Sequence, residues 1–365
     1  MDSLREYIEP IKKKWVYHFI VSQKTSVIEK PEWYLNQTLK WIYEHIDIVE
    51  AEAKKASTNE SQARQQFIKY MLELAHMRLS KDMTKLTTTI NDSPHSEAIL
   101  IHTYNEVIQF VKIIRQLLGD RYQNDLNDKQ DLMAVFADQV LFERIDQVEW
   151  EYSKKNLREI TSCDSRWEPV LEGDYVDHYK IPRCVDRFLL QIRSISERVD
   201  CFRQLDCKFR LIDLQVSLFN KLLSFMKKSE PLTASKNMIS DILLFSDDSE
   251  INLSRLSRVL NGVNFLRLIL KEKCFISPDV SDELDKELKS RLDKATKDYV
   301  TYFNGLIVKV INDYEQSGCD LQEFLDFIKP KLAKDIFELV RDEALKKDQT
   351  RHTETMFKGL SLGRE

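Results

Sequence analysis

The chain has 365 residues, of which 42% are hydrophobic and 32% are charged, and its formal net charge is −5. This composition supports folded domains with hydrophobic cores and excludes a disordered protein. The interspersed charges exclude a field that would attract nucleic acid, so we expect no nucleic-acid partner. Because only 7 Gly and 8 Pro occur, turn formers are scarce, and the sequence predicts an all-α fold.

Two helices are predicted before residue 56. Apolar residues recur at helical spacing in the first one, at Ile8, Ile11, Trp15 and Phe19. The second helix is expected to begin at Pro31, because proline fits the first helical turn and disfavours helical conformation in the residue before it. Its apolar stripe consists of Leu35, Leu39, Ile42, Ile46 and Val49.

Three further helices are predicted before residue 161. The first carries apolar residues over 67–86, and the next runs from 96 to 118, where Gly119 can adopt a left-handed cap. The Asp- and Asn-rich stretch 120–131 lacks the glycine and the closing glutamate of a calcium loop, so we interpret it as helix-capping sequence around Asp128 and Asp131. A single helix is then expected over 132–160.

The periodicity is lost over 161–182, where Pro169, Gly173 and Pro182 interrupt the pattern. Trp167 and Tyr175 indicate that this stretch folds against a domain. We therefore predict a first helical bundle domain at 1–162, a linker at 163–182 and a second helical bundle region at 183–365. This second region can divide into sub-bundles at 183–275 and 278–350.

The second region shows helical patterns over 188–199, 209–225, 238–245 and 253–270. One long helix is expected from 281 to 314. The last segment, 321–345, is helical with an interruption at Pro330, and residues 349–365 are expected to fray.

No local pattern predicts catalysis or a bound cofactor. The sequence contains no G-x-S-x-G, no G-x-x-x-x-G-K-[ST] and no G-x-G-x-x-G motif, so we expect no enzyme, no cofactor and no metal. His76 and His102 lie in helical stripes, where hydrogen-bonded structural histidines are the more common interpretation. An all-α enzyme whose site assembles only in three dimensions stays an alternative.

The cysteines and the hydropathy indicate a cytosolic setting. The cysteines form no C-x-x-C pair, and we expect them to be reduced; they are Cys163, Cys184, Cys201, Cys207, Cys274 and Cys319. No apolar stretch reaches the roughly twenty residues of a membrane-spanning helix, so we expect no direct membrane insertion.

Several motifs occur together in a recognisable order. They are KKWVYHF at 13–19, KPEWYL at 30–35, VLFER at 140–144, IPRCVDRF at 181–188, SERV at 196–199, FRLIDLQ at 209–215 and VLNGVNFL at 259–266. In this order the chain resembles the RINT/TIP family, most clearly over 11–220. The matching positions, here called the signature residues, are Trp15, Tyr17, His18, Phe19, Lys30, Pro31, Trp33, Tyr34, Leu35, Phe142, Glu143, Arg144, Pro182, Cys184, Phe188, Leu214 and Gln215.

This resemblance implies an elongated rod of consecutive helical bundles, the CATCHR-type architecture of exocyst, COG and GARP subunits. It implies a non-enzymatic subunit of the Dsl or NRZ tethering complex, which captures Golgi-derived COPI vesicles at the endoplasmic reticulum. The implied partners are ER SNARE proteins and other tether subunits. The implied location is cytosolic and peripheral, on the cytoplasmic face of the endoplasmic reticulum. The resemblance does not identify the partner-binding residues.

Family members begin with a helical segment that pairs with a neighbouring subunit, and this chain starts almost at KKWVYHF. We therefore expect either a fragment or a short member in which that docking segment is absent. A generic helical scaffold of another complex, such as an exocyst-like rod at the plasma membrane, is the alternative function.

Overall fold

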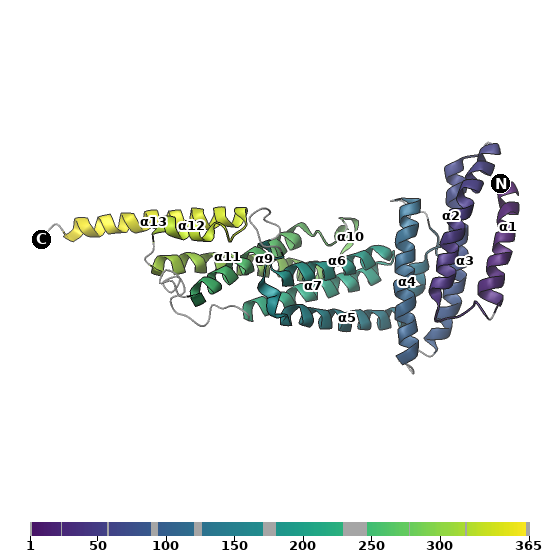
Figure 1. Ribbon diagram of the computed structural model, residues 1–365, viewed down its shortest axis with the longest axis horizontal. Helices are drawn as coiled ribbons and strands as arrows, with labels where there is room; N and C mark the ends of the chain where they lie inside the picture. The colour runs from purple at the N-terminus through teal and green to yellow at the C-terminus, as the bar shows by residue number, and fades with distance from the viewer. Residues whose placement is uncertain are drawn as a thin grey trace. The chain divides into compact units, whose positions relative to one another are not determined.

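The protein is all-α, as the composition predicts (Figure 1). The computed structural model describes residues 2–22, 24–56, 58–88, 94–119, 126–170, 180–228, 247–276, 278–317 and 320–362. These residues contain no β-strand, and an isolated bridge joins Pro169 to Pro182. The predicted helix at 238–245, Tyr175 and Cys319 lie outside the described residues.

The chain folds as two compact units. Unit 1 consists of residues 1–151 and 197–211, and unit 2 of residues 152–196 and 212–365. The CATCHR-type rod and the sequence-based division at 163–182 stay predictions.

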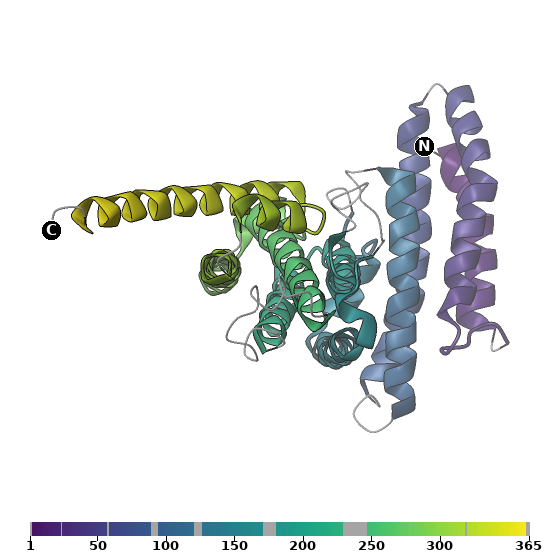
Figure 2. The same ribbon diagram turned by 60° about the vertical axis from the view of Figure 1, so that its left-hand side comes forward.

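Unit 1 begins with α1 (Asp2–Val16), the π-helix η1 (Tyr17–Val21), α2 (Pro31–Lys55), α3 (Glu60–Thr87) and α4 (Pro94–Leu118). The helix α2 packs along α3 and contacts α4, and α1 lies against α2 and α3 (Figure 2). The largest fully buried side chains of the unit are Trp15, Tyr34, Leu35, Ile42, Phe67, Tyr104, Phe110, Phe136 and Phe202. The apolar stripes predicted from the sequence therefore face this core.

The predicted helix boundaries at Pro31 and Gly119 are confirmed. Pro31 is the first residue of α2. The side chain of Asn59 caps α3 by accepting a hydrogen bond from the backbone N–H of Gln62, at 3.1 Å. Gly119 follows α4 with φ of 78°, a left-handed conformation that glycine adopts without steric cost.

The single helix expected over 132–160 is wrong. The structure has the 3-10 helix η2 (Leu132–Ala137), capped by Asp131, followed by the separate helix α5 (Gln139–Ser162). The break occurs because the carboxylate of Asp138 accepts hydrogen bonds from the backbone N–H groups of Val140 and Leu141 and so starts a new helix. The apolar pattern continues across this break, so the periodicity did not indicate it.

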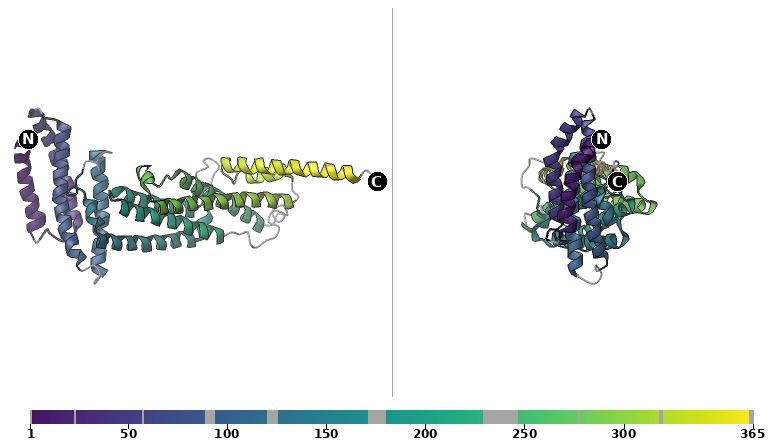
Figure 3. Two further views of the ribbon diagram at one scale, coloured as in Figure 1. Left: turned by 180° about the vertical axis from the view of Figure 1, so that it is seen from behind. Right: turned by 90° about the vertical axis from the view of Figure 1, so that its right-hand side faces the viewer.

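Unit 2 contains the second part of α5, the 3-10 helix η3 (Asp164–Trp167), and parts of α6 (Arg183–Cys201) and α7 (Leu205–Lys228). It continues with α9 (Asp247–Glu272), α10 (Pro278–Glu283), α11 (Lys286–Ser317), α12 (Leu321–Ile328) and α13 (Lys334–Leu362). The helix α11 packs along α9, and α13 contacts both of them (Figure 3). The ring of Trp167 is buried and stacks on Phe225, so this part of the 161–182 stretch folds against unit 2, as predicted.

Two expectations for the second region are wrong. The helix expected over 281–314 is divided into α10 and α11, because Asp285 accepts a hydrogen bond from the backbone N–H of Leu288, at 2.8 Å, and starts a second helix. The segment expected to fray from residue 349 continues α13 to Leu362. No proline occurs between 349 and 362, so the backbone there can continue the helix.

A close approach between α9 and the start of α6 depends on Gly262. A Cβ atom at this position would lie 2.9 Å from Cγ2 of Val185 and 3.0 Å from Cδ of Pro182. These distances are shorter than carbon atoms tolerate, so only glycine lets the two segments pack this closely.

No described helix is long and apolar enough to cross a membrane.

We expect Gly262→Ala to lower the free energy of unfolding by about 1–3 kcal/mol, because the added methyl group forces the packed segments apart. The matched control is Gly305→Ala in α11, where a Cβ would meet nothing within 4 Å. Alanine favours a helix over glycine by up to about 1 kcal/mol, so this control is expected to be neutral or stabilising. Urea unfolding followed by circular dichroism measures both. An equal effect of the two substitutions would contradict the close packing.

Candidate functional site

The motifs KKWVYHF and KPEWYL meet in the core of unit 1. Trp15, near the end of α1, is completely buried, and its ring Nε1–H donates a hydrogen bond to Oγ1 of Thr38 on α2, at 3.0 Å. Thr38 in turn donates to the backbone carbonyl of Tyr34, at 2.7 Å. The ring of Trp15 packs edge-on against Tyr34, with 6.4 Å between centroids, and lies 5.2 Å from Phe19. Residues of the two motifs therefore fix α1 and η1 against α2.

A buried arginine from α3 completes this cluster. Arg78 forms an ion pair with Asp82 at 2.7 Å, and both side chains are almost fully inaccessible to solvent. Its guanidinium also donates hydrogen bonds to the backbone carbonyl of Phe19 and the hydroxyl of Ser26, and it lies over the ring of Tyr34. Burial raises the pKa of the Asp82 carboxyl, and the Arg78 charge opposes this shift.

The π-helical turn η1 provides the carbonyl that Arg78 binds. The backbone N–H of Ser22 donates to the carbonyl of Tyr17 at 2.8 Å, the five-residue spacing of a π-helix. The motif KKWVYHF thus ends in an unusual turn that a side chain from another helix stabilises. Local sequence reasoning missed Arg78 and Asp82, although two opposite charges four residues apart within the apolar stripe of α3 were the available signal.

The other signature residues of these two motifs differ in exposure. Pro31 and Leu35 are buried, His18 is half-buried, and Lys30 is exposed and pairs with Glu32 at 3.6 Å. Two large aromatic side chains face solvent: Tyr17 is 61% exposed and Trp33 is 45% exposed. Packing of unit 1 therefore accounts for most of the signature but not for these two side chains.

Glu32 links the KPEWYL motif to α4. Its carboxylate lies 3.2 Å from Nε2 of His102. Partial burial alone would raise the pKa of Glu32, but a hydrogen bond from its own backbone, the contact with His102 and the charge of Lys30 together lower it. His102 is thus a hydrogen-bonded residue, as predicted. His76 is half-buried and lies 3.4 Å from the hydroxyl of Ser80.

The VLFER motif lies on α5 in unit 1. Phe142 is buried and packs edge-on against Phe202, while the guanidinium of Arg210 covers its ring at 5.5 Å. Arg144 forms an ion pair with Glu97 of α4. Glu143 is exposed and accepts a hydrogen bond from a glutamine of the same helix. The motif therefore connects α5 to other segments of unit 1.

The later signature residues form contacts within unit 2. Pro182, Cys184 and Phe188 are buried at the start of α6, and burial raises the pKa of the Cys184 thiol to about 12. Leu214 is buried on α7, and the amide of the neighbouring Gln215 donates to the carbonyl of Ile192 at 3.0 Å. These positions hold α6 and α7 together.

The cysteines within the described residues are unpaired. The free thiols are Cys163, Cys184, Cys201, Cys207 and Cys274. Of these, Cys184, Cys201 and Cys207 are buried. Within the same part of the chain no group of three or more His, Cys, Asp or Glu side chains is placed to hold a metal ion.

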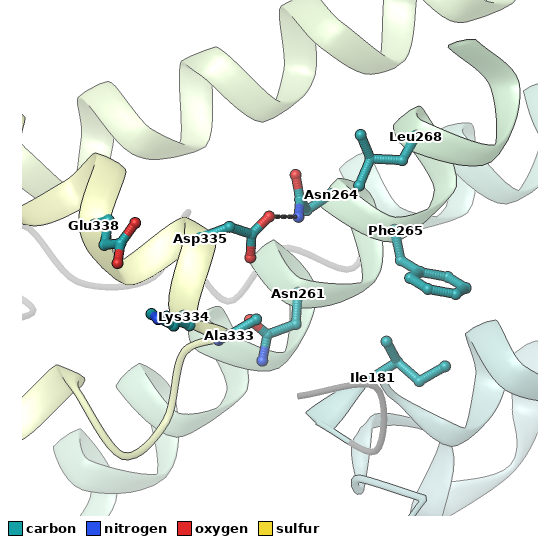
Figure 4. A pocket seen from close by; sticks show the side chains of 9 residues that line it. All are labelled: Ile181, Asn261, Asn264, Phe265, Leu268, Ala333, Lys334, Asp335 and Glu338. Carbon is teal, nitrogen blue, oxygen red and sulfur yellow. Dashed lines mark hydrogen bonds between the residues drawn. The ribbon is translucent and has the colours of Figure 1, made fainter. Parts of the chain in front are cut away.

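Unit 2 contains a pocket of about 400 Å³ between α9 and the start of α13 (Figure 4). The residues that line it are Ile181, Asn261, Asn264, Phe265, Leu268, Ala333, Lys334, Asp335 and Glu338. The size is typical of a ligand site. Sequence reasoning missed this pocket, although four of its residues lie in or directly after the VLNGVNFL motif at the i, i+3, i+4 and i+7 positions of one helix face.

The sequence matches a known protein family and is similar to a curated relative. Residues 3–346 match the model of the RINT-1/TIP-1 family. A RINT1-like protein of Drosophila melanogaster is 21% identical over 269 residues, which cover 73% of this chain and 33% of that relative. The aligned region thus spans about a third of the length of that protein. No solved structure matches the chain.

We expect Arg78→Met to lower the free energy of unfolding by about 3–5 kcal/mol, because it leaves the buried Asp82 carboxylate without a counter-charge. The matched control is Arg64→Met, which removes the more exposed ion pair with Glu50 and should cost less than about 1 kcal/mol. Denaturant unfolding of both variants measures the difference. If Arg78→Met were as mild as the control, the cluster would not stabilise unit 1.

Proposed function

Since the chain belongs to the RINT-1/TIP-1 family, we propose that it is a non-enzymatic subunit of a multisubunit vesicle tether. In this proposal the complex captures Golgi-derived COPI vesicles at the endoplasmic reticulum and engages ER SNAREs there. The chain itself is peripheral, on the cytoplasmic face of that membrane. The observation that carries the proposal is the family match, which extends over residues 3–346.

The contacts of the signature residues are consistent with a scaffold. Trp15, Tyr34, Phe142, Phe188 and Gln215 are buried and join one helix to another. Burial of these five side chains in contacts between helices supports a structural role for them. The family motifs therefore describe how helices are assembled, as a tether subunit requires.

A helical scaffold binds partners through surfaces that accept helices or extended segments. Aromatic side chains contribute strongly to such interfaces because they bury a large area at low entropic cost. Tyr17 and Trp33 belong to the signature but do not serve the core of unit 1. We assign them to the surface that contacts another subunit or a SNARE.

The first test is affinity capture of the tagged chain from extracts of the cells that express it. We expect other tether subunits and ER SNAREs to be enriched over a tag-only control, as quantified by mass spectrometry. If neither this chain nor a longer version of it enriched any of them, the proposal would be overturned. Enrichment of plasma-membrane tether subunits would support an exocyst-like scaffold instead.

The second test compares exposed aromatic residues. We expect Trp33→Ala combined with Tyr17→Ala to reduce the recovery of partners at least about tenfold, since interface aromatics each contribute about 2 kcal/mol or more. The matched control is Tyr43→Ala, which removes an aromatic residue of α2 that is 55% exposed and lies outside the signature. The unfolding midpoint should stay unchanged in both. Equal recovery from the double variant and the control would contradict this assignment.

A further inference from the structure

The pocket between α9 and α13 has two chemically different ends. Figure 4 shows Asp335 and Glu338 on α13 at one end, and Ile181, Phe265 and Leu268 at the other. We propose that this pocket binds a segment of a partner protein that presents a basic side chain beside a bulky apolar one. The inference does not depend on the tethering role, because it rests on the lining of the pocket alone.

The lining residues at the acidic end carry two carboxylates and one ammonium group. Asp335 and Glu338 lie three positions apart, so they project from the same side of α13. Asp335 accepts a hydrogen bond from the amide of Asn264 at 2.9 Å, whereas Glu338 has no hydrogen bond or ion pair with any other residue that the structure describes. Lys334 is the cationic side chain among the lining residues. The unpartnered carboxylate of Glu338 is therefore the group at this end that favours a cationic ligand.

The nearest arginine does not fill this role. The Nε of Arg267 donates to Oδ1 of Asn264 at 2.8 Å, and its guanidinium covers the ring of Phe303 on α11 at 4.3 Å. Partial burial lowers the pKa of Arg267, while the charge of Asp335 opposes this shift. The charge of Arg267 therefore acts on Asp335, and Glu338 is the carboxylate that stays open to a cation from outside the chain.

The apolar end offers surface for an aliphatic or aromatic side chain. Phe265 and Leu268 are both half-buried and follow each other by one turn of α9, and Ile181 faces them from the segment before α6. Covering this apolar surface with a partner side chain would add hydrophobic stabilisation to the charge contact. A ligand that carries only a charge would leave this end in contact with water.

The walls of the pocket are held in place before any ligand binds. The side-chain amide of Asn261 donates to the backbone carbonyl of Lys331 at 3.1 Å and to that of Lys180 at 3.3 Å. Its oxygen accepts a hydrogen bond from the backbone N–H of Ala333 at 3.0 Å, at the start of α13. One asparagine of α9 thus connects three segments around the pocket. A preorganised pocket avoids the entropic cost of ordering its walls on binding.

A helix of a partner protein fits this arrangement. Side chains three or four positions apart lie on the same face of a helix, so a Lys or Arg and a Leu, Ile, Phe or Trp at this spacing can reach the two ends together. We therefore assign the pocket to an amphipathic basic helix.

The test is a selection of helical peptides displayed on phage against the complete chain. We expect the enriched peptides to pair a basic residue with a bulky apolar residue three or four positions away. The enriched peptide is then synthesised with a fluorescent label, and its affinity is measured by anisotropy. Glu338→Lys is expected to weaken its binding at least about tenfold, because the substitution reverses the charge that the basic residue contacts.

The matched control is Glu343→Lys, which makes the same charge change on the same helix at a residue that does not line the pocket. Its affinity for the peptide should equal that of the unmodified chain. Circular dichroism confirms that both variants fold. A selection without binders, a peptide without a basic residue, or equal affinities of the two variants would overturn the proposal. An oligomer that only Glu338→Lys dissociates would identify a second copy of the chain as the occupant and would also overturn it.

Discussion

Backbone carbonyls that are buried where helices meet need hydrogen-bond donors, and in this protein polar side chains from other helices supply them. Arg78 donates to the carbonyl of Phe19, and Asn261 donates to that of Lys331. Each of these donors lies at least one helix away from its acceptor in the sequence. A buried carbonyl without its donor would cost about 1–3 kcal/mol, so these bonds determine which helices can pack together.

This constraint explains why the family motifs look unlike a chemical site. The motif KKWVYHF contributes a carbonyl and two aromatic rings, and its donor comes from α3, where no motif was noted. The motif IPRCVDRF similarly contributes Pro182 and Val185, which leave room only for Gly262 of α9. Each of these two motifs thus supplies one side of a contact, and a residue from another segment supplies the other side.

Much of the fold was predictable because its signals are local. Pro31 begins a helix, and Gly119 ends one through backbone preferences that depend on a single residue, while the apolar stripes report the buried faces directly. The breaks at Asp138 and Asp285 were missed because apolar spacing continues across them and a capping carboxylate has the same appearance as a surface charge. The Arg78 cluster and the pocket were missed for a different reason. Part of each lies on a single helix, but the groups that these residues contact come from distant segments that only the folded chain brings together.

The buried and the exposed signature residues carry different information: the buried ones indicate the fold, and the exposed ones are available for contact with partners. A buried residue such as Trp15 or Phe188 serves a contact between helices, so its presence indicates the fold and not a partner. Partner recognition must instead use side chains that the core does not need. Trp33 on α2 and Glu338 on α13 are of this kind, and they belong to different units. Because one is aromatic and the other acidic, the two proposed surfaces would suit partners of different chemistry.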